Sequence, residues 1–153
     1  MTNLYNDIVE VGPLNFPAIF LEKNELFHSA DIITLHVPLT SATRHLIDTK
    51  ALSHFKTGSF LINTARGAIV DGVAVAQALV SGKLAGAGFD VFDSEPPPAD
   101  HPLLLARNTI LTPHIGARTV SGLARMYSVV DDVARVLRGE APVYSAWIQE
   151  CRT

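Results

Sequence analysis

The stretch Ser59–Phe92, SFLINTARGAIVDGVAVAQALVSGKLAGAGFDVF, decides the fold of this chain. Its first part, Ser59–Ala65, is a short apolar run with the length of a buried strand. Asp71 is a residue type that caps helices, and the apolar residues after it predict a helix that ends near Val80. Ala85–Phe92 predicts another strand, in which small residues allow close backbone approach. A strand, a helix and a strand in this order predict a βαβ unit and therefore a parallel sheet.

The same alternation continues on both sides of this stretch. Short runs rich in Ile, Leu and Val predict strands, whereas apolar residues spaced by three and four predict helices. The predicted strands are Leu4–Val9, Ala18–Leu21, Asp31–Val37 and Thr109–Thr112, and the predicted helices are Lys23–Ser29, Thr49–Phe55 with Asp48 as its cap, and about 120–138. The Pro-rich segment Ser94–Pro102 predicts an irregular surface loop.

The last predicted helix is the longest, and it carries two apolar stripes side by side. The first stripe is Val120, Leu123, Tyr127, Val130, Ala134 and Leu137, and the second is Met126, Val129, Val133 and Val136. So wide an apolar surface favours a helix that is covered on more than one side, by its own sheet and by another surface.

Composition narrows the class of protein. A chain of 153 residues is long enough for one domain with a core. Its net charge is −3, and the charged residues are scattered along the chain. The absence of a basic stripe argues against a nucleic-acid partner. No apolar run approaches the roughly 20 residues of a membrane helix, and the first residues lack a signal-peptide pattern. The single cysteine, Cys151, cannot form an internal disulfide, so a cytoplasmic location is expected.

Two kinds of catalytic site are disfavoured by their missing motifs. The histidines form no HExxH pair and the chain has no cysteine cluster, so no metal site is expected. A serine hydrolase is disfavoured because no G-x-S-x-G turn occurs.

Polar side chains follow four successive predicted strands, at the point where each strand ends. They are His36, Arg66, Asp90 with Glu95 beyond it, and His114. Ligands of open α/β sheets bind beyond the carboxyl ends of the strands. The sequence therefore predicts one rim at which these groups converge.

The chemistry of such a rim follows from the residue types. An imidazole such as that of His114 titrates near neutral pH and can act as general acid and base, although a lone histidine is more often structural. Glu95 can orient it, or can be an exposed loop carboxylate. Arg66 can hold a substrate carboxylate through two parallel hydrogen bonds, or can form a structural salt bridge. Asp90 is costly to bury unpaired, so it is either hydrogen-bonded within the protein or directed at a ligand amide.

Four segments resemble successive signature blocks of the D-isomer-specific 2-hydroxyacid dehydrogenases. They are ADIITLHVPLTSATRHLID (Ala30–Asp48), TGSFLINTARGAIVD (Thr57–Asp71), GAGFDVFDSEPPP (Gly86–Pro98) and ILTPHIGARTV (Ile110–Val120). The blocks occur in the family's order and with its spacing, and the match as a whole runs from about Leu4 to Gly139. The resemblance implies an α/β fold: a truncated, doubly wound, Rossmann-like parallel sheet with flanking helices and a long C-terminal helix.

The resemblance also implies roles for the rim. Arg66 looks like the residue that binds the substrate carboxylate and polarises its carbonyl. His114 looks like the acid/base that exchanges a proton with the 2-hydroxyl, and Glu95 like its orienting partner. The implied reaction moves a hydride between NAD and a small 2-hydroxy or 2-keto acid.

The cofactor implied by the resemblance is NAD. Asp7, in the sequence LYND, resembles the acidic residue that accepts hydrogen bonds from the adenosine ribose, which would disfavour the 2′-phosphate of NADP. By the same similarity, the rest of the nucleotide and nicotinamide site would be lined by His36, Val37, Pro38, Thr43, Thr64, Ala65, Asp90 and Gly116.

The chain departs from the family at its start. The family's first strand and its G-x-G-x-x-G turn, which takes the pyrophosphate at a helix N-terminus, have no counterpart here, and neither does the substrate domain. The resemblance therefore predicts a partial NAD-binding domain over residues 1–139 and a C-terminal tail over residues 140–153.

The missing strand is central in the family's sheet, and deleting it leaves its two neighbours roughly 10 Å apart. Three outcomes are possible: the LYND strand moves into the empty position, another chain supplies a strand, or the N-terminal segment detaches from the sheet. The first two are favoured. Because the last helix would also keep a bare apolar face, a homodimer or a strand-complemented oligomer is expected.

Two functional hypotheses compete, and a third hypothesis concerns the position of the start codon. The leading hypothesis is an NAD-linked oxidoreductase that is weak or inactive as this isolated chain. The alternative is a dehydrogenase remnant that acts as an oligomerisation or scaffolding module. A start codon set too late, with Met1 inside a longer protein, would explain the missing turn.

Overall fold

The computed structural model of the chain describes residues 1–12 and 14–143. They fall into two compact units: Met1–His114, and a second unit that begins at Ile115. Of the predicted tail, residues 140–143 are within the described part, whereas Cys151 lies outside it.

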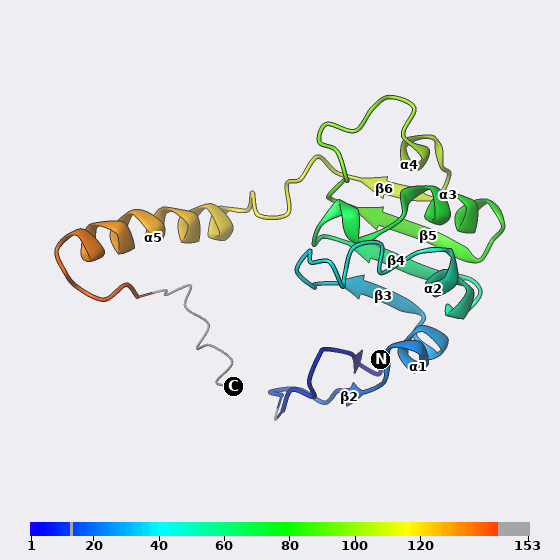
Figure 1. Cartoon of the computed structure of the whole chain (residues 1–153), viewed down its shortest axis with the longest axis horizontal. Helices are drawn as coiled ribbons and strands as arrows, with labels where there is room; N and C mark the ends of the chain where they lie inside the picture. Colours follow the sequence, from blue (N-terminus) through cyan, green and yellow to red (C-terminus); the bar gives the residue numbers. More distant parts are fainter. Residues whose placement is uncertain (13, 144–153) are drawn as a thin grey trace. The chain divides into compact units, whose positions relative to one another are not determined.

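The centre of the first unit is a four-stranded parallel sheet (Figure 1). Its strands are β3 (Ile32–Leu35), β4 (Ser59–Asn63), β5 (Leu84–Phe89) and β6 (Thr109–Leu111), in the spatial order β3-β4-β5-β6. Every neighbouring pair is parallel, as the alternation of strands and helices predicted. The last residues of the four strands are register partners of one another, so the strands end at a common edge: Leu35, Asn63, Phe89 and Leu111.

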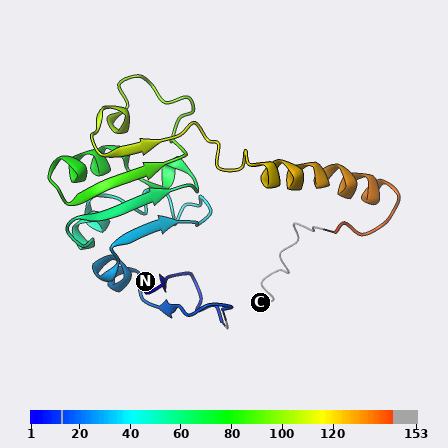
Figure 2. The same ribbon diagram turned by 180° about the vertical axis from the view of Figure 1, so that it is seen from behind.

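Helices cover one face of this sheet. They are α1 (Lys23–Ser29), α2 (Thr49–His54) and α3 (Gly72–Val80), and Figures 1 and 2 show α2 and α3 on the same side. The core lies between them and the sheet and includes Leu61 from β4 and Val75 from α3, both fully buried. The rings of Phe27 and Phe55 pack with centroids 4.8 Å apart.

The opposite face of the sheet is apolar but not covered by helices of this unit (Figure 2). Side chains alternate along β3 and β4 between buried and exposed. Ile32, Phe60 and Ile110 point away from the core and are 56%, 46% and 76% exposed. Within this unit the helices pack against the other face, so these side chains are left open to solvent.

The predicted starts of α2 and α3 are confirmed by their caps. The Asp48 carboxylate accepts a hydrogen bond from the Ala51 N–H, and that of Asp71 accepts from Val73 and Ala74. Two short helices were not predicted from sequence: a 3-10 turn at Gly67–Ile69 and α4 at Pro102–Leu105. The first lies between β4 and α3, and the second ends the Pro-rich loop.

The N-terminal segment forms a separate two-stranded parallel sheet from β1 (Leu4–Tyr5) and β2 (Ile19–Phe20). The first predicted strand, Leu4–Val9, ends early because Asn6 and Asp7 turn the chain: the Asn6 amide donates to the Leu21 carbonyl, and Asp7 accepts from the Ile8 N–H. Neither strand pairs with β3. The expectation that the LYND strand moves into the empty position is therefore wrong; within this chain the segment stands apart from the main sheet, and complementation by another chain stays a prediction.

The second unit contains α5 (Val120–Leu137), whose N-cap Thr119 accepts from the Gly122 N–H. No residue of α5 is buried within this chain, so the predicted cover of its apolar stripes stays a prediction. In the described part of the chain, α5 and every other helix are too short or too polar to cross a membrane.

Candidate functional site

The common edge of the sheet gathers the polar residues that follow its strands. Because the four strands end in register, His36, Thr64, Asp90 and Thr112 come directly after them along one rim. Asp90 is 7% exposed, and its carboxylate accepts a hydrogen bond from the Thr112 hydroxyl at 2.5 Å. The rim predicted from sequence is thus present, with a buried carboxylate held at its centre.

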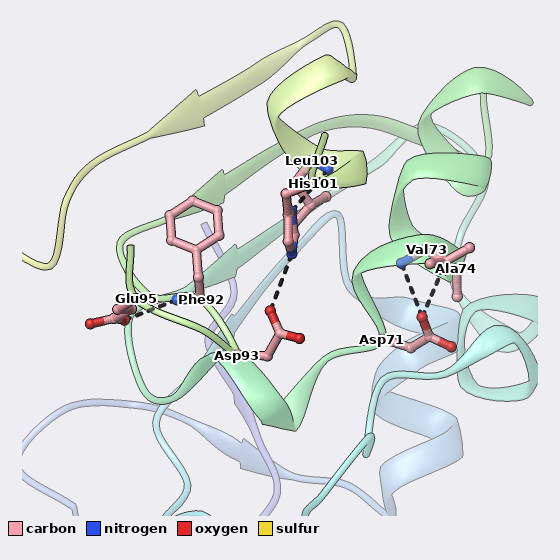
Figure 3. Close-up of polar contacts among 8 residues, drawn as sticks. All are labelled: Asp71, Val73, Ala74, Phe92, Asp93, Glu95, His101 and Leu103. Carbon is pink, nitrogen blue, oxygen red and sulfur yellow. Dashed lines mark hydrogen bonds and ion pairs between the residues drawn. The ribbon is translucent and has the colours of Figure 1, made fainter. Parts of the chain in front are cut away.

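Glu95 and His114 meet at this rim. Glu95 Oε2 lies 2.8 Å from His114 Nδ1, and Glu95 Oε1 accepts from the Phe92 N–H at 3.0 Å (Figure 3 draws the second contact). The hydrogen bond with His114, followed by the one from Phe92, lowers the pKa of Glu95. An ionised carboxylate only accepts hydrogen bonds, so His114 carries its proton on Nδ1 and presents Nε2 outward from the pair.

The lowered pKa of Glu95 has a measurable consequence. A carboxyl whose pKa is lower in the folded chain than in the unfolded one stabilises the fold at higher pH, and this contribution is lost as the pH falls through the folded value. We expect the Glu95 carboxyl to titrate at a higher pH after His114→Ala, as measured by carbon NMR of labelled glutamate. Asp100→Ala, at an exposed carboxylate of the same loop, is the control and should leave the titration unchanged. An unchanged midpoint in His114→Ala would contradict the contact.

His114 occupies a strained backbone conformation. Its φ is +53°, in the left-handed region that residues other than glycine rarely adopt. The His114 N–H donates to the Asp90 carbonyl at 2.8 Å, which fixes the backbone at this point. The turn directs the side chain toward Glu95, and outliers of this kind cluster at functional sites.

Arg66 is exposed and follows β4 by three residues, where Asn63 shapes the turn. The fully buried Asn63 amide donates to the Arg66 carbonyl at 2.9 Å and accepts from the Ala65 N–H at 3.0 Å. Sequence reasoning missed Asn63, although a polar residue at the buried end of a strand is a signal of such a turn. The Arg66 guanidinium donates to the Ala65 carbonyl at 2.6 Å, and no described hydrogen bond or ion pair joins it to Glu95 or His114.

Gly67 links the Arg66 turn to the Glu95 loop through backbone packing. A Cβ added at Gly67 would lie 1.8 Å from the Phe92 carbonyl carbon and 2.2 Å from the Asp93 nitrogen. The two backbones therefore touch, and Arg66 is adjacent in sequence to the point of contact. The structure thus brings together Glu95, His114 and Asp90 by hydrogen bonds, and attaches Arg66 to them through the main chain.

The residues expected to line a nucleotide site are distributed along the two sheets. Asp7 is exposed just after β1, and His36 accepts or donates a hydrogen bond with Thr34 at 2.9 Å. The Thr43 hydroxyl donates to the Pro38 carbonyl at 2.6 Å and thereby closes the turn after β3. Thr64 follows β4 directly, Val37 and Ala65 are the second residues after β3 and β4, and Gly116 lies in the second unit.

Comparison with known proteins decides the family. Residues 5–116 match the family described as "D-isomer specific 2-hydroxyacid dehydrogenase, NAD binding domain". The chain belongs to this family. Glyoxylate reductase of Thermofilum pendens is 43% identical over 124 residues, which are 80% of this chain and 37% of that protein.

Solved structures agree with the assignment. A glyoxylate reductase from Paecilomyes thermophila has a TM-score of 0.89 and 32% identity, over 98% of this chain and 46% of its own. D-lactate dehydrogenase of Lactobacillus jensenii, solved with NAD+, has a TM-score of 0.87 and 28% identity, over 95% and 48%. The fold is therefore the Rossmann-like α/β fold of these dehydrogenases, and NAD is the cofactor of the 2-hydroxyacid dehydrogenase domain. The chain spans less than half the length of these relatives.

The residues present fit the two ends of a dinucleotide better than its middle. Asp7 offers an exposed carboxylate for ribose hydroxyls, and Asp90 offers a carboxylate at the end of β5 for an amide. The described part of this 2-hydroxyacid dehydrogenase domain has no glycine-rich turn leading into a helix that could take the pyrophosphate, because α1 begins after Glu22 without such a turn.

Proposed function

We propose that the chain is the NAD-binding part of an enzyme that interconverts a small 2-hydroxy acid and the corresponding 2-keto acid. The observation that carries this proposal is the Glu95–His114 hydrogen bond beside the buried Asp90. A histidine held by a carboxylate at the carboxyl edge of a parallel sheet is arranged for acid/base chemistry. NAD, when bound, supplies the hydride acceptor or donor.

Proton transfer, orientation of the imidazole and binding of the substrate carboxylate are assigned to three residues of the rim. His114 holds its Nδ1 proton against Glu95, so Nε2 is the atom that takes a proton from the substrate hydroxyl or returns it to the carbonyl oxygen. Glu95 keeps the ring oriented through this hydrogen bond. Arg66 offers the guanidinium donors that are not used on Ala65 to the substrate carboxylate.

We propose that the cofactor is held by Asp7 at its ribose end and by Asp90 at its amide end. Within the first unit, the lining in this proposal is completed by His36, Val37, Pro38, Thr43, Thr64 and Ala65. Residues 1–139 form the partial NAD-binding domain and residues 140–153 the tail. Without a turn for the pyrophosphate, the isolated chain should bind NAD weakly and turn over 2-keto acids poorly.

The test of this function is calorimetric titration of the purified chain with NAD and with NADP. We expect weak binding of NAD, and a loss of about tenfold in affinity after Asp7→Asn, which is the effect of weakening one hydrogen bond to a charged group. Asp31→Asn, at an exposed carboxylate on another loop, is the control and should bind NAD as before. Equal binding by Asp7→Asn and the unchanged chain would contradict the cofactor assignment. Rapid NADH oxidation with glyoxylate, pyruvate or hydroxypyruvate would contradict the expected poor turnover by the isolated chain.

A second function is favoured by α5. Its apolar side chains include Val129 and Val133, which are 60% and 53% exposed, and a helix of this kind favours self-association. The chain would then act in the cytoplasm as an oligomerisation or scaffolding module, as a homodimer or a strand-complemented oligomer. If Arg66→Ala and His114→Ala in the gene leave the phenotype intact, this function replaces the first.

A further inference from the structure

A second histidine–carboxylate pair, His101 and Asp93, lies on the same loop as Glu95. His101 is 9% exposed, and its Nε2 is 3.2 Å from Asp93 Oδ1 (Figure 3). Its other nitrogen, Nδ1, accepts from the Leu103 N–H at 3.3 Å and so caps α4. A nitrogen that accepts a hydrogen bond carries no proton, so the proton of His101 is on Nε2 and is donated to Asp93. Both ring nitrogens of a nearly buried imidazole are therefore satisfied in one tautomer.

The His101–Asp93 pair is attached to the segment that holds Glu95. The Phe92 ring packs edge-on against the His101 ring, with centroids 5.4 Å apart and an interplanar angle of 88°. The Phe92 N–H donates to Glu95 Oε1, and the other oxygen of Glu95 contacts His114. The buried His101 side chain thus contacts two residues: it packs against the Phe92 ring and donates to the Asp93 carboxylate. The backbone N–H of Phe92 in turn donates to Glu95.

This attachment matters because the Glu95–His114 pair is on the surface. The side chains of His114 and Glu95 are 51% and 38% exposed. Exposed pairs of this kind gain little from their charges, because solvent screens them and two free side chains must be ordered. Glu95 meets His114 reliably only if the backbone from Phe92 to Glu95 is already fixed. His101 is the buried group that fixes it.

We propose that Asp93 and His101 are positioning residues for the acid/base histidine. The Asp93 side chain is 59% exposed and is not part of the hydrophobic core. Its hydrogen bond with His101 therefore serves to hold the loop in the conformation that presents Glu95 to His114. The inference rests on the proposed function, since it assigns these residues to the same Glu95–His114 pair.

The simpler alternative is that His101 only caps α4. His101→Asn separates the two roles: asparagine is a preferred N-cap that can still accept from Leu103, but it is too short to reach Asp93. Asp93→Ala removes the bond from the loop side, whereas Asp93→Asn keeps an oxygen that accepts from His101 Nε2. The matched control is Asp100→Ala, at an exposed carboxylate of the same loop.

The experiment is long-range proton–nitrogen NMR of the nitrogen-labelled chain, which shows which ring nitrogen of His114 carries the proton. We expect the ratio of the Nδ1–H to the Nε2–H form to fall roughly threefold in Asp93→Ala and His101→Asn, the effect of losing an exposed pair. Asp93→Asn and Asp100→Ala should keep the original ratio.

Two results would overturn the inference, and only the second would also overturn the proposed function. If Glu95→Ala changes the His114 ratio but Asp93→Ala and His101→Asn do not, Asp93 and His101 do not position the pair, and the proposed function stands. If Glu95→Ala also leaves the ratio unchanged, the acid/base pair itself fails, and the proposed function fails with it. Should Asp93→Ala unfold the chain, His101→Asn and Asp93→Asn decide between the same outcomes.

Discussion

Gly67→Ala is expected to destabilise the chain by about 3 kcal/mol, the upper part of the range for overpacking a filled site. The added methyl carbon would lie 1.8 Å from the Phe92 carbonyl carbon and 2.2 Å from both the Phe92 oxygen and the Asp93 nitrogen. All three are backbone atoms, so no side chain can rotate away, and one of the two main-chain segments must move. Urea unfolding followed by circular dichroism measures the loss.

The same change should also disturb the proposed acid/base pair, because the displaced segment is the one that donates to Glu95. NMR signals of Phe92, Glu95 and His114 are expected to shift together. Gly12→Ala is the matched control: a Cβ there meets nothing within 4 Å, and stability should be unchanged. A Gly67→Ala variant as stable as the control would show that the two backbones are not packed as described.

Asn63→Leu is expected to cost about 2 kcal/mol, which is the effect of leaving partly buried polar groups without partners. The Asn63 amide satisfies both the Ala65 N–H and the Arg66 carbonyl. Leucine has the branching of asparagine without its polar groups but is larger, so at this fully buried position the loss includes overpacking as well as the missing hydrogen bonds. The midpoint of thermal unfolding should fall by several degrees.

The position of Arg66 should change with it, since its carbonyl is no longer held. Asn24→Leu, at an exposed position of α1, is the control for the change of residue type and should leave the unfolding midpoint nearly unchanged. If Asn63→Leu is as stable as Asn24→Leu, the turn after β4 does not depend on the Asn63 amide.

The main sheet was predictable because its signals are local. Asp48 and Asp71 announce helix starts, and the runs at β3, β4 and β5 are dense in strand-forming or small residues. The rim followed from these, because parallel strands that end in register must bring His36, Asp90 and the residues after β6 to one edge. Glu95 and His114 were expected to meet for this reason, and they do.

The pairing of the N-terminal strands could not be predicted in the same way. Residues 4–9 have strand character, but which strand they pair with depends on distant segments, and Asn6 and Asp7 end the strand by side-chain hydrogen bonds. The His101–Asp93 contact carried no signal either, because it joins two residues of an irregular loop without periodicity. The turn at Gly67–Ile69, for which Arg66 is the N-cap, was not predicted from sequence either.

The left-handed backbone of His114 has a consequence for engineering this protein. Glycine adopts a φ of +53° without steric cost and asparagine with little, whereas histidine adopts it with strain on the order of 1 kcal/mol. A library screened for heat resistance alone would therefore enrich variants that replace His114. Each such variant would gain stability at the residue to which we assign the acid/base role, so a search for more stable forms of this chain needs a binding or turnover readout beside the thermal one.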